Sequence, residues 1–217
     1  MSSNFRIRYY LDILQSFIYT YTMKKVFIIN GVEPYPWAPG RLNATFVDIA
    51  REYFESNGCE VNVTKVCEDY DIQAEVDKIA EADLVILQFP LEWFNVSWSC
   101  KKYFDTVLIA GQGKHAHSDG RHHDSPKEGY GTGGLLTGKY MLSVTQNAPI
   151  EAFGNLSETF FNGITPDQML TPIHLTFRFI GLTPVASFFS SDVMKNPTIP
   201  EDLERFKEHL RHYFPFK

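Results

Sequence analysis

VFIINGVEPYPWAPGRLNATFVDIAREYF, residues 26–54, joins a strand-like start to a helix-like end through a rigid loop. The apolar run Val26–Ile29 predicts a strand that is buried on both faces. Leu42 begins a set of apolar residues at helical spacing, and Asn57-Gly58 predicts the end of that helix. The loop between them holds three prolines and two glycines. Such a junction is typical of a phosphate site, because free backbone N–H groups and the helix dipole favour an anion there.

The same alternation of strand and helix patterns continues to the end of the chain. Further strands are predicted at 61–66, 84–89, 140–146 and 184–189, and further helices at 72–80, 98–109, 167–180 and 200–213. Five strands alternating with helices predict an α/β fold, with a five-stranded parallel sheet and helices on both faces. Ligands of such sheets lie beyond the carboxyl ends of the strands, so the loops that follow strands form the candidate site.

Residues 1–22 differ in character from the rest of the chain. They include Arg6 and Arg8, but Asp12 and Gln15 interrupt any signal-like apolar core, and no small-residue cleavage site follows. Met23 is followed by KKVFIIN, which reads as a natural start. We therefore expect an N-terminal extension at 1–22 that is poorly ordered, and a single domain of ordinary size at 23–217.

Composition narrows the class of protein. The net charge of −6, from 20 Lys+Arg against 26 Asp+Glu, argues against a general nucleic-acid binder. Three scattered cysteines without a CxxC pair argue against a disulfide framework or a zinc site, and they favour a reducing compartment. A cytoplasmic location is expected on that ground. No apolar run approaches the roughly 20 residues that cross a bilayer.

The loop NGVEPYPWAPGRLNAT, residues 30–45, allows two interpretations. It lacks GxGxxG, so a Rossmann dinucleotide site is not supported. It still leads into a helix start, where Gly40 permits close backbone approach, Arg41 adds charge, and Asn43 and Thr45 add side-chain donors. The alternative is a plain βα loop in which Asn43 caps the helix.

Two further loops follow predicted strands. In QFPLEWFNVSW, residues 88–98, Pro90 ends the strand, and Trp93 and Phe94 come where a core residue would be hard to cover. We interpret them as a wall for a planar ring, and Trp98 as part of a hydrophobic plug under the next helix. In TQNAPIEAF, residues 145–153, three polar side chains are placed to bond the edge of a heterocycle. A phosphate cradle, an aromatic wall and a polar edge at three adjacent strand ends fit a flavin.

Several of these blocks resemble one known family. LQFPLEWFNVSWSCKKYFDTV (87–107), SDGR (118–121), GYGTGGLLTGKYMLSVTQNAPIEAF (129–153) and PIHLTFRFIGLTP (172–184) resemble the flavodoxin-like NAD(P)H:quinone oxidoreductases, and in particular the branch called modulator of drug activity B. The likeness spans roughly Met23 to the C-terminus. It implies a flavodoxin-like fold, bound FAD, reduction by NADPH or NADH, a quinone or related small aromatic acceptor, and a homodimer.

The resemblance also implies roles for individual residues. The pyrophosphate and adenine side of FAD would lie along Ala38, Pro39, Gly40, Arg41, Leu42, Asn43, Ala44 and Thr45. The isoalloxazine would be bordered by Leu91, Glu92, Trp93 and Phe94, approached by Tyr130, and held at its other edge by Thr145, Gln146, Asn147 and Ala148. The loop PYPWAPG departs from the family, whose phosphate loop commonly carries Ser or His.

The activity expected from this resemblance is two-electron reduction of a quinone by a ping-pong mechanism on one shared face of the flavin. An FMN-dependent azo- or nitroreductase remains an alternative, since it uses similar chemistry on another acceptor. So does a non-enzymatic regulatory or electron-carrying module on the same fold. A visible spectrum separates these readings, because the regulatory module lacks a coloured cofactor.

The segment KHAHSDGRHHD, residues 114–124, is the other concentration of reactive side chains. It supplies His115, His117, His122 and His123 together with Asp119 and Asp124, which is enough nitrogen and oxygen for a metal. No thiolate joins them and the loop is polar, so we interpret them as solvated histidines and expect no metal. His174 follows Leu170 at helical spacing, and we expect a satisfied core or dimer-face histidine there.

Overall fold

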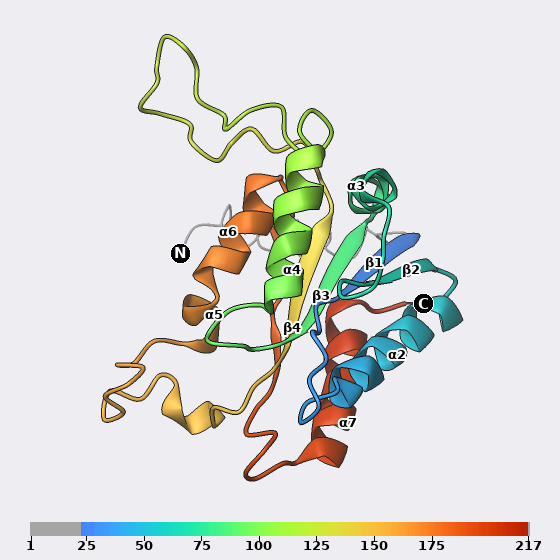
Figure 1. Cartoon of the computed structure of the whole chain (residues 1–217), viewed down its shortest axis with the longest axis vertical. Helices are drawn as coiled ribbons and strands as arrows, with labels where there is room; N and C mark the ends of the chain where they lie inside the picture. The colour runs from blue at the N-terminus through green and yellow to red at the C-terminus, as the bar shows by residue number, and fades with distance from the viewer. Residues whose placement is uncertain (1–22, 217) are drawn as a thin grey trace, which may run out of the picture.

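The structure, a computed structural model, describes residues 23–216, and its centre is a sheet of apolar strands (Figure 1). The strands are β1 (Lys25–Asn30), β2 (Glu60–Lys65), β3 (Leu84–Pro90), β4 (Lys139–Thr145), β5 (Thr183–Pro184) and β6 (Phe188–Ser190). Their order is β2-β1-β3-β4-β5, with β6 also paired to β4, and every pairing is parallel. The predicted α/β fold with a parallel sheet is confirmed.

The predicted fifth strand is divided in two. Residues 185–187 lie outside both strands, although Val185 N still donates to Tyr140 O of β4 at 2.8 Å. Pro184 has no N–H to donate, and the carbonyl of Ala186 turns out of the sheet to accept a bond from His209 Nε2 at 2.9 Å. This partner is 23 residues away in the sequence, so no local pattern could reveal the interruption.

Helices cover both faces of the sheet (Figure 1). They are α2 (Arg41–Ser56), α3 (Ile72–Glu81), α4 (Trp98–Tyr103) with the π-helical turn η1 (Phe104–Leu108), the 3₁₀ turn η2 (Ile150–Ala152), α5 (Pro166–Met169), α6 (Thr171–Phe179) and α7 (Ile199–Tyr213). On one face α2 and α7 bury Phe46 and Phe206 against Ile28. On the other face α3, α4, η1 and α6 pack around neighbours such as Tyr103 and Phe177. Alternate residues of each strand therefore serve two separate cores.

One predicted helix is shorter than expected. The pattern at 167–180 folds as α5 and α6, with a break at Leu170. Thr165 begins α5 with a capping box to Gln168, and Pro172 suits the first turn of α6 because its missing N–H needs no partner there.

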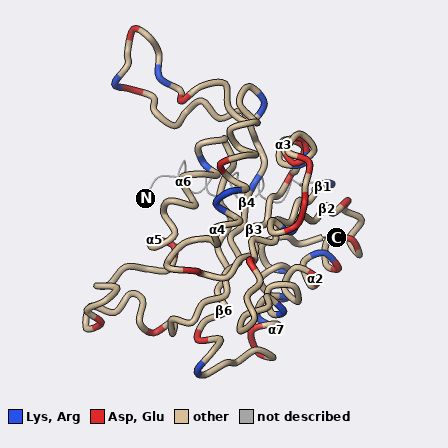
Figure 2. The backbone as a smooth tube through the Cα atoms, viewed as in Figure 1, with Lys and Arg blue, Asp and Glu red and all other residues tan. Residues whose placement is uncertain are grey.

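Charged residues are spread along helices and loops, with Lys and Arg mixed among Asp and Glu (Figure 2). Within residues 23–216 no helix is both long and apolar enough to span a membrane. The predictions for the extension at 1–22 lie outside the described residues.

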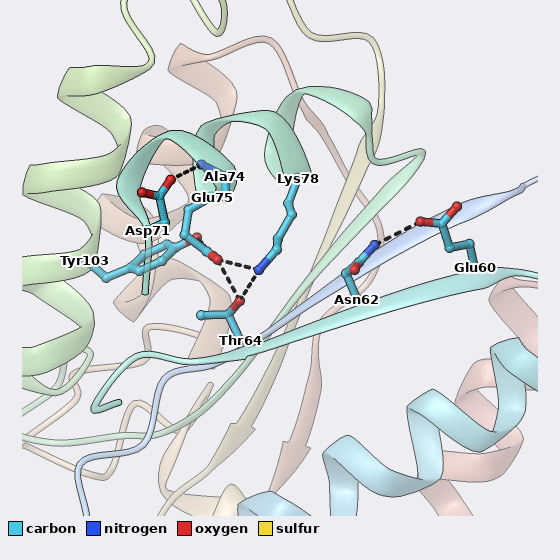
Figure 3. A network of polar contacts seen from close by, with 8 residues as sticks. All are labelled: Glu60, Asn62, Thr64, Asp71, Ala74, Glu75, Lys78 and Tyr103. Atoms are coloured by element: carbon cyan, nitrogen blue, oxygen red, sulfur yellow. Dashed lines mark hydrogen bonds and ion pairs between the residues drawn. The ribbon is translucent and has the colours of Figure 1, made fainter. Parts of the chain in front are cut away.

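One acidic side chain is buried beneath α3 (Figure 3). Glu75 is 1% exposed, and it accepts bonds from Lys78 Nζ at 2.5 Å and Thr64 Oγ1 at 3.0 Å through Oε1. Its Oε2 accepts the hydroxyl of the fully buried Tyr103 at 2.8 Å. Burial, together with the Glu75 carboxylate, raises the pKa of Tyr103 far above its usual range, so the phenol remains a donor. This network ties α3 to β2 and α4.

Candidate active site

Three loops meet at the carboxyl ends of neighbouring strands β1, β3 and β4. Leu91 N donates to Thr145 O at 2.8 Å, which joins the loop after β3 to the end of β4. The hydroxyl of Tyr35, in the loop after β1, lies 3.4 Å from the carboxylate of Glu92. The three segments that the sequence singles out separately are therefore adjacent in the fold.

Asn43 does not cap α2, so that interpretation of the first loop is wrong. The N-cap is Gly40, with φ of 80°, and a Cβ at this position would lie 2.5 Å from Val32 Cγ2. Asn43 is buried instead, where its Nδ2 donates to Thr145 Oγ1 at 3.1 Å and its Oδ1 accepts from Gln88 Nε2 at 2.8 Å. The side chain thus fixes the start of α2 against the ends of β3 and β4.

The start of α2 is open to an anion. No side chain caps the helix, and no acidic residue lies in its first turn. The exposed Arg41 adds a positive charge, and Ala44 N is bonded to Gly40 O at 3.0 Å as the helix begins. Free amides at a helix start and a nearby cation together favour a phosphate.

The loop that follows β3 holds its two aromatic residues in a strained turn. Glu92 N donates to Asn95 O at 2.9 Å and Asn95 N donates back to Glu92 O at 3.0 Å. Trp93 and Phe94 occupy the centre of this turn with φ of 49° and 65°, backbone angles that residues other than glycine rarely adopt. Trp93 is 94% exposed. The amide N–H groups of both residues have no partner within residues 23–216. Strain of this kind is typical of functional sites.

Trp98 is not part of a hydrophobic plug, in contrast to our expectation. It is 62% exposed, because it opens α4 directly after the cap Ser97, which accepts from Cys100 N at 3.2 Å. Val96 and Cys100 take the buried positions.

The end of β4 presents polar groups to the same region. Gln146 is 2% exposed, its Nε2 donates to Ser191 Oγ at 3.1 Å, and its Oε1 has no partner among the described residues. Asn147 is exposed and Ala148 is half-buried. Sequence reasoning missed the loop after β6, in which Val193 N donates to Gln146 O at 3.2 Å and Asp192 N donates to Ala148 O at 3.3 Å.

Other residues were missed as well. Trp37 is 76% exposed and stacks on Tyr35 with ring centroids 5.3 Å apart, beside the start of α2. Gln88 lies under Asn43. The two aromatic residues in PYPW were a signal that could have drawn attention to Tyr35 and Trp37. Gln88 gave no such signal, because it lies at the end of a predicted strand.

Tyr130 is not brought to the other predicted site residues. It lies in the long loop 111–138, which extends from the end of the sheet opposite to the segment that follows β4 (Figure 1). Its ring centroid is 5.9 Å from that of Phe179, and it lines a groove of 1120 Å³ between α4–η1 and α6.

No metal site is found in the histidine-rich segment. Among residues 23–216, no group of three or more His, Cys, Asp or Glu side chains is arranged so that it could hold a metal ion. The interpretation of solvated histidines is wrong for His115, which is 1% exposed. Its Nε2 lies 2.8 Å from Val76 O, and Nδ1 is buried without a partner in the described structure. The carbonyl accepts, so Nε2 carries the hydrogen. His174 is satisfied by Tyr140 OH at 2.7 Å and Asp167 at 3.2 Å.

Burial of His115 makes stability depend on pH. Burial lowers its pKa below the ordinary value, so in mild acid the unfolded chain binds a proton that the folded chain does not. The free energy of unfolding is expected to fall as pH decreases below about 6.5, by at most about 1.4 kcal/mol per pH unit for this group. Urea titrations of the wild type and H115Q between pH 7.5 and 5 would check this. We expect the free energy of unfolding to decrease less in H115Q than in the wild type over this range.

His209 contributes in the same direction, because burial lowers its pKa too, so some pH dependence remains in H115Q. The matched control is H123Q, since the His123 side chain is fully exposed. An identical pH dependence in H115Q and H123Q would contradict this assignment.

Comparison with known proteins agrees with this geometry. Residues 24–214 match the family model for the flavodoxin-like fold. The NADPH:quinone oxidoreductase MdaB of Haemophilus influenzae is 41% identical over 190 residues, covering 87% of this chain and 98% of that protein. The chain therefore belongs to the flavodoxin-like family, in the branch that contains MdaB. The resemblance found in the sequence is confirmed.

More distant likenesses extend the comparison. The human ribosyldihydronicotinamide dehydrogenase [quinone] is 38% identical over 122 residues, which is 54% of this chain and 47% of that protein. A putative quinone reductase from Klebsiella pneumoniae superposes with a TM-score of 0.70 at 23% identity, covering 90% of this chain and 86% of the other. General stress protein 14 of Treponema denticola, solved with FMN, superposes at 0.56 with 20% identity, covering 88% and 95%. These two structures show the shared fold alone.

The residues present fit a flavin. Gln146 Oε1 is a buried acceptor without a partner in the described structure, suited to a ring N–H, and the Trp93 and Phe94 amides are donors without partners. The backbone at Gly40, close against Val32, leaves the start of α2 clear of side chains. Donors, an acceptor and an anion site thus meet in one place.

Proposed function

We propose that this chain is an FAD-dependent NAD(P)H:quinone oxidoreductase. The observation that carries the proposal is the meeting of an open helix start, a strained aromatic turn and an unpartnered buried amide oxygen at three adjacent strand ends. The name of the relative MdaB supports NADPH as the reductant and a quinone as the acceptor. A cytoplasmic location remains part of the proposal.

Each group of residues has a distinct task in this proposal. A flavin bound here would supply two-electron chemistry between a reduced nicotinamide and a quinone, with the two substrates reacting in turn in a ping-pong sequence. The start of α2 and Arg41 hold the pyrophosphate, with Ala38 and Pro39 towards the adenine. Trp93 and Phe94 wall the ring, and their free amides offer hydrogen bonds to its edge. Gln146, held from two sides by the loop after β6, orients the opposite edge.

Glu92 helps to shape this site. Partial burial raises the pKa of its carboxyl group, although the bond from Tyr35 opposes the shift. The pair joins the loop after β1 to the strained turn that follows β3.

We further propose that the chain acts as a homodimer. Within one chain the loop 111–138, which carries Tyr130, extends from the opposite end of the sheet (Figure 1), so we infer that Tyr130 approaches the flavin of a second copy. The groove beside Tyr130 carries the exposed apolar residues Ile109 (71%) and Leu175 (53%), which a second copy would cover. Light scattering after size exclusion is expected to give twice the mass of one chain, and a monomer mass at micromolar concentration would refute the dimer.

The function is tested by the visible spectrum of the purified protein and by identification of the flavin it releases. We expect a flavin spectrum, release of FAD, bleaching by NADPH without oxygen, and recovery on addition of a quinone. Release of FMN together with faster turnover of an azo dye would favour an azoreductase. A colourless protein that takes up no added flavin would refute the proposal and favour a regulatory module.

A further inference from the structure

A second aromatic segment contacts the strained turn. The chain that follows β4 returns at Phe160 and Phe161, whose ring centroids lie 5.3 Å and 6.3 Å from that of Phe94. Phe161 also stacks on Phe153 at 4.1 Å, and Phe153 is 8% exposed. We call these four phenylalanines the aromatic bracket. It anchors Phe94 to a buried side chain far along the sequence.

Phe160 differs from the other rings that support Phe94. It is 71% exposed, and its plane is tilted by 39° from that of Phe94, which is itself 45% exposed. The exposed ring of Phe94, on the strained turn, and the neighbouring exposed ring of Phe160 together form apolar surface without a partner in the described structure. Phe94 directly follows Trp93 in the strained turn, so this surface adjoins the proposed flavin site.

Charge in this region favours an uncharged occupant. The segment that carries Phe160 also carries Glu151 and Glu158, both exposed, and Glu92 precedes the turn. A small polyanion would be repelled here, whereas a neutral planar ring could pack on the exposed faces of Phe94 and Phe160.

We propose that Phe160 determines acceptor specificity: with Phe94 it forms an apolar wall that favours neutral, fused-ring quinones over small polar acceptors. Phe161 is a positioning residue that acts by holding Phe94 in place. The proposal rests on the quinone reductase function and adds to it the class of acceptor and the residue that selects it.

The kinetic test compares two electron acceptors in F160A. The Michaelis constant for 1,4-naphthoquinone is expected to rise about tenfold, the size of one lost ring contact. The flavin content and the rate with ferricyanide, a small polyanion, should stay within about twofold. L156A is the matched control: Leu156 is 83% exposed in the same segment, and it belongs to no ring contact.

A binding test does not depend on turnover. Calorimetric titration of the oxidised protein with 1,4-naphthoquinone, without NADPH, should show about tenfold weaker binding in F160A and no change in L156A. For Phe161, F161L should raise the Michaelis constant for naphthoquinone at unchanged kcat, and F161Y, which keeps the ring, should restore it.

Three outcomes overturn the inference. One is an unchanged ratio of naphthoquinone to ferricyanide turnover in F160A. Another is an equal loss of binding in L156A, which would mean that the segment acts by general hydrophobicity. A change of oligomeric mass in F160A would assign the ring to a contact between copies. Failure of the underlying function is seen separately, as a wild-type protein without flavin or without NADPH oxidation.

Discussion

Replacing Trp93 by alanine is expected to lower kcat/KM for a quinone at least tenfold, or to cause loss of flavin on gel filtration, with little change in melting temperature. The indole is 94% exposed, so folding buries little of it and stability depends on it weakly. A planar ring bound at the turn would bury that surface. Activity and flavin content should therefore fall while stability is retained.

Trp98 provides the matched control for this prediction. It is 62% exposed, lies five positions further along the chain at the start of α4, and is not among the residues that we assign to the site. W98A should retain both flavin and turnover. Unchanged turnover in W93A with a large loss of melting temperature would show that Trp93 serves the fold and not the site.

Replacing Glu75 by alanine is expected to lower the free energy of unfolding by about 3 kcal/mol, measured by urea denaturation. The change leaves the Tyr103 hydroxyl buried without its acceptor (Figure 3). It also removes the carboxylate that pairs with Lys78, although Lys78 keeps its bond to Thr64 Oγ1 at 3.0 Å and is 30% exposed. Since this network lies outside the proposed site, flavin content per folded molecule should be unchanged.

Asp77 lies two positions further along α3 and gives the comparison. It pairs with Lys114 at 2.7 Å, but both side chains are 46% exposed and solvent screens the pair, so D77A should lower the free energy of unfolding much less than E75A does. Equal losses in E75A and D77A would contradict the role given to burial.

The central strands could be predicted because a strand buried on both faces requires a continuous run of apolar residues, which is visible in the local sequence. Val26–Ile29 and 84–87 are uninterrupted apolar runs, and both belong to strands of the core. The division of the fifth strand could not be predicted, because it depends on His209 from α7. The break at Leu170 had a local sign in Pro172, but the helical spacing on either side concealed it.

The site was predictable in outline and not in its connections. Strand-end position drew attention to Trp93 and Gln146, but Asn43 meets Thr145 across 102 positions, and no spacing reveals such a contact. Phe160 was missed for the same reason, since it reaches Phe94 from a segment without regular structure. His115 seemed solvated because its neighbours are polar, yet it packs under Val76. In each case the position of the side chain depends on a contact with a residue that is distant in the sequence.

Hydrogen–deuterium exchange of the flavin-free protein, with and without added FAD, tests the central claim most directly. The account predicts slower exchange in three groups of peptides, those that contain residues 38–45, 91–95 and 145–148. Protection confined to peptides that line the groove between α4 and α6, or no protection at any of the three strand ends, would contradict it.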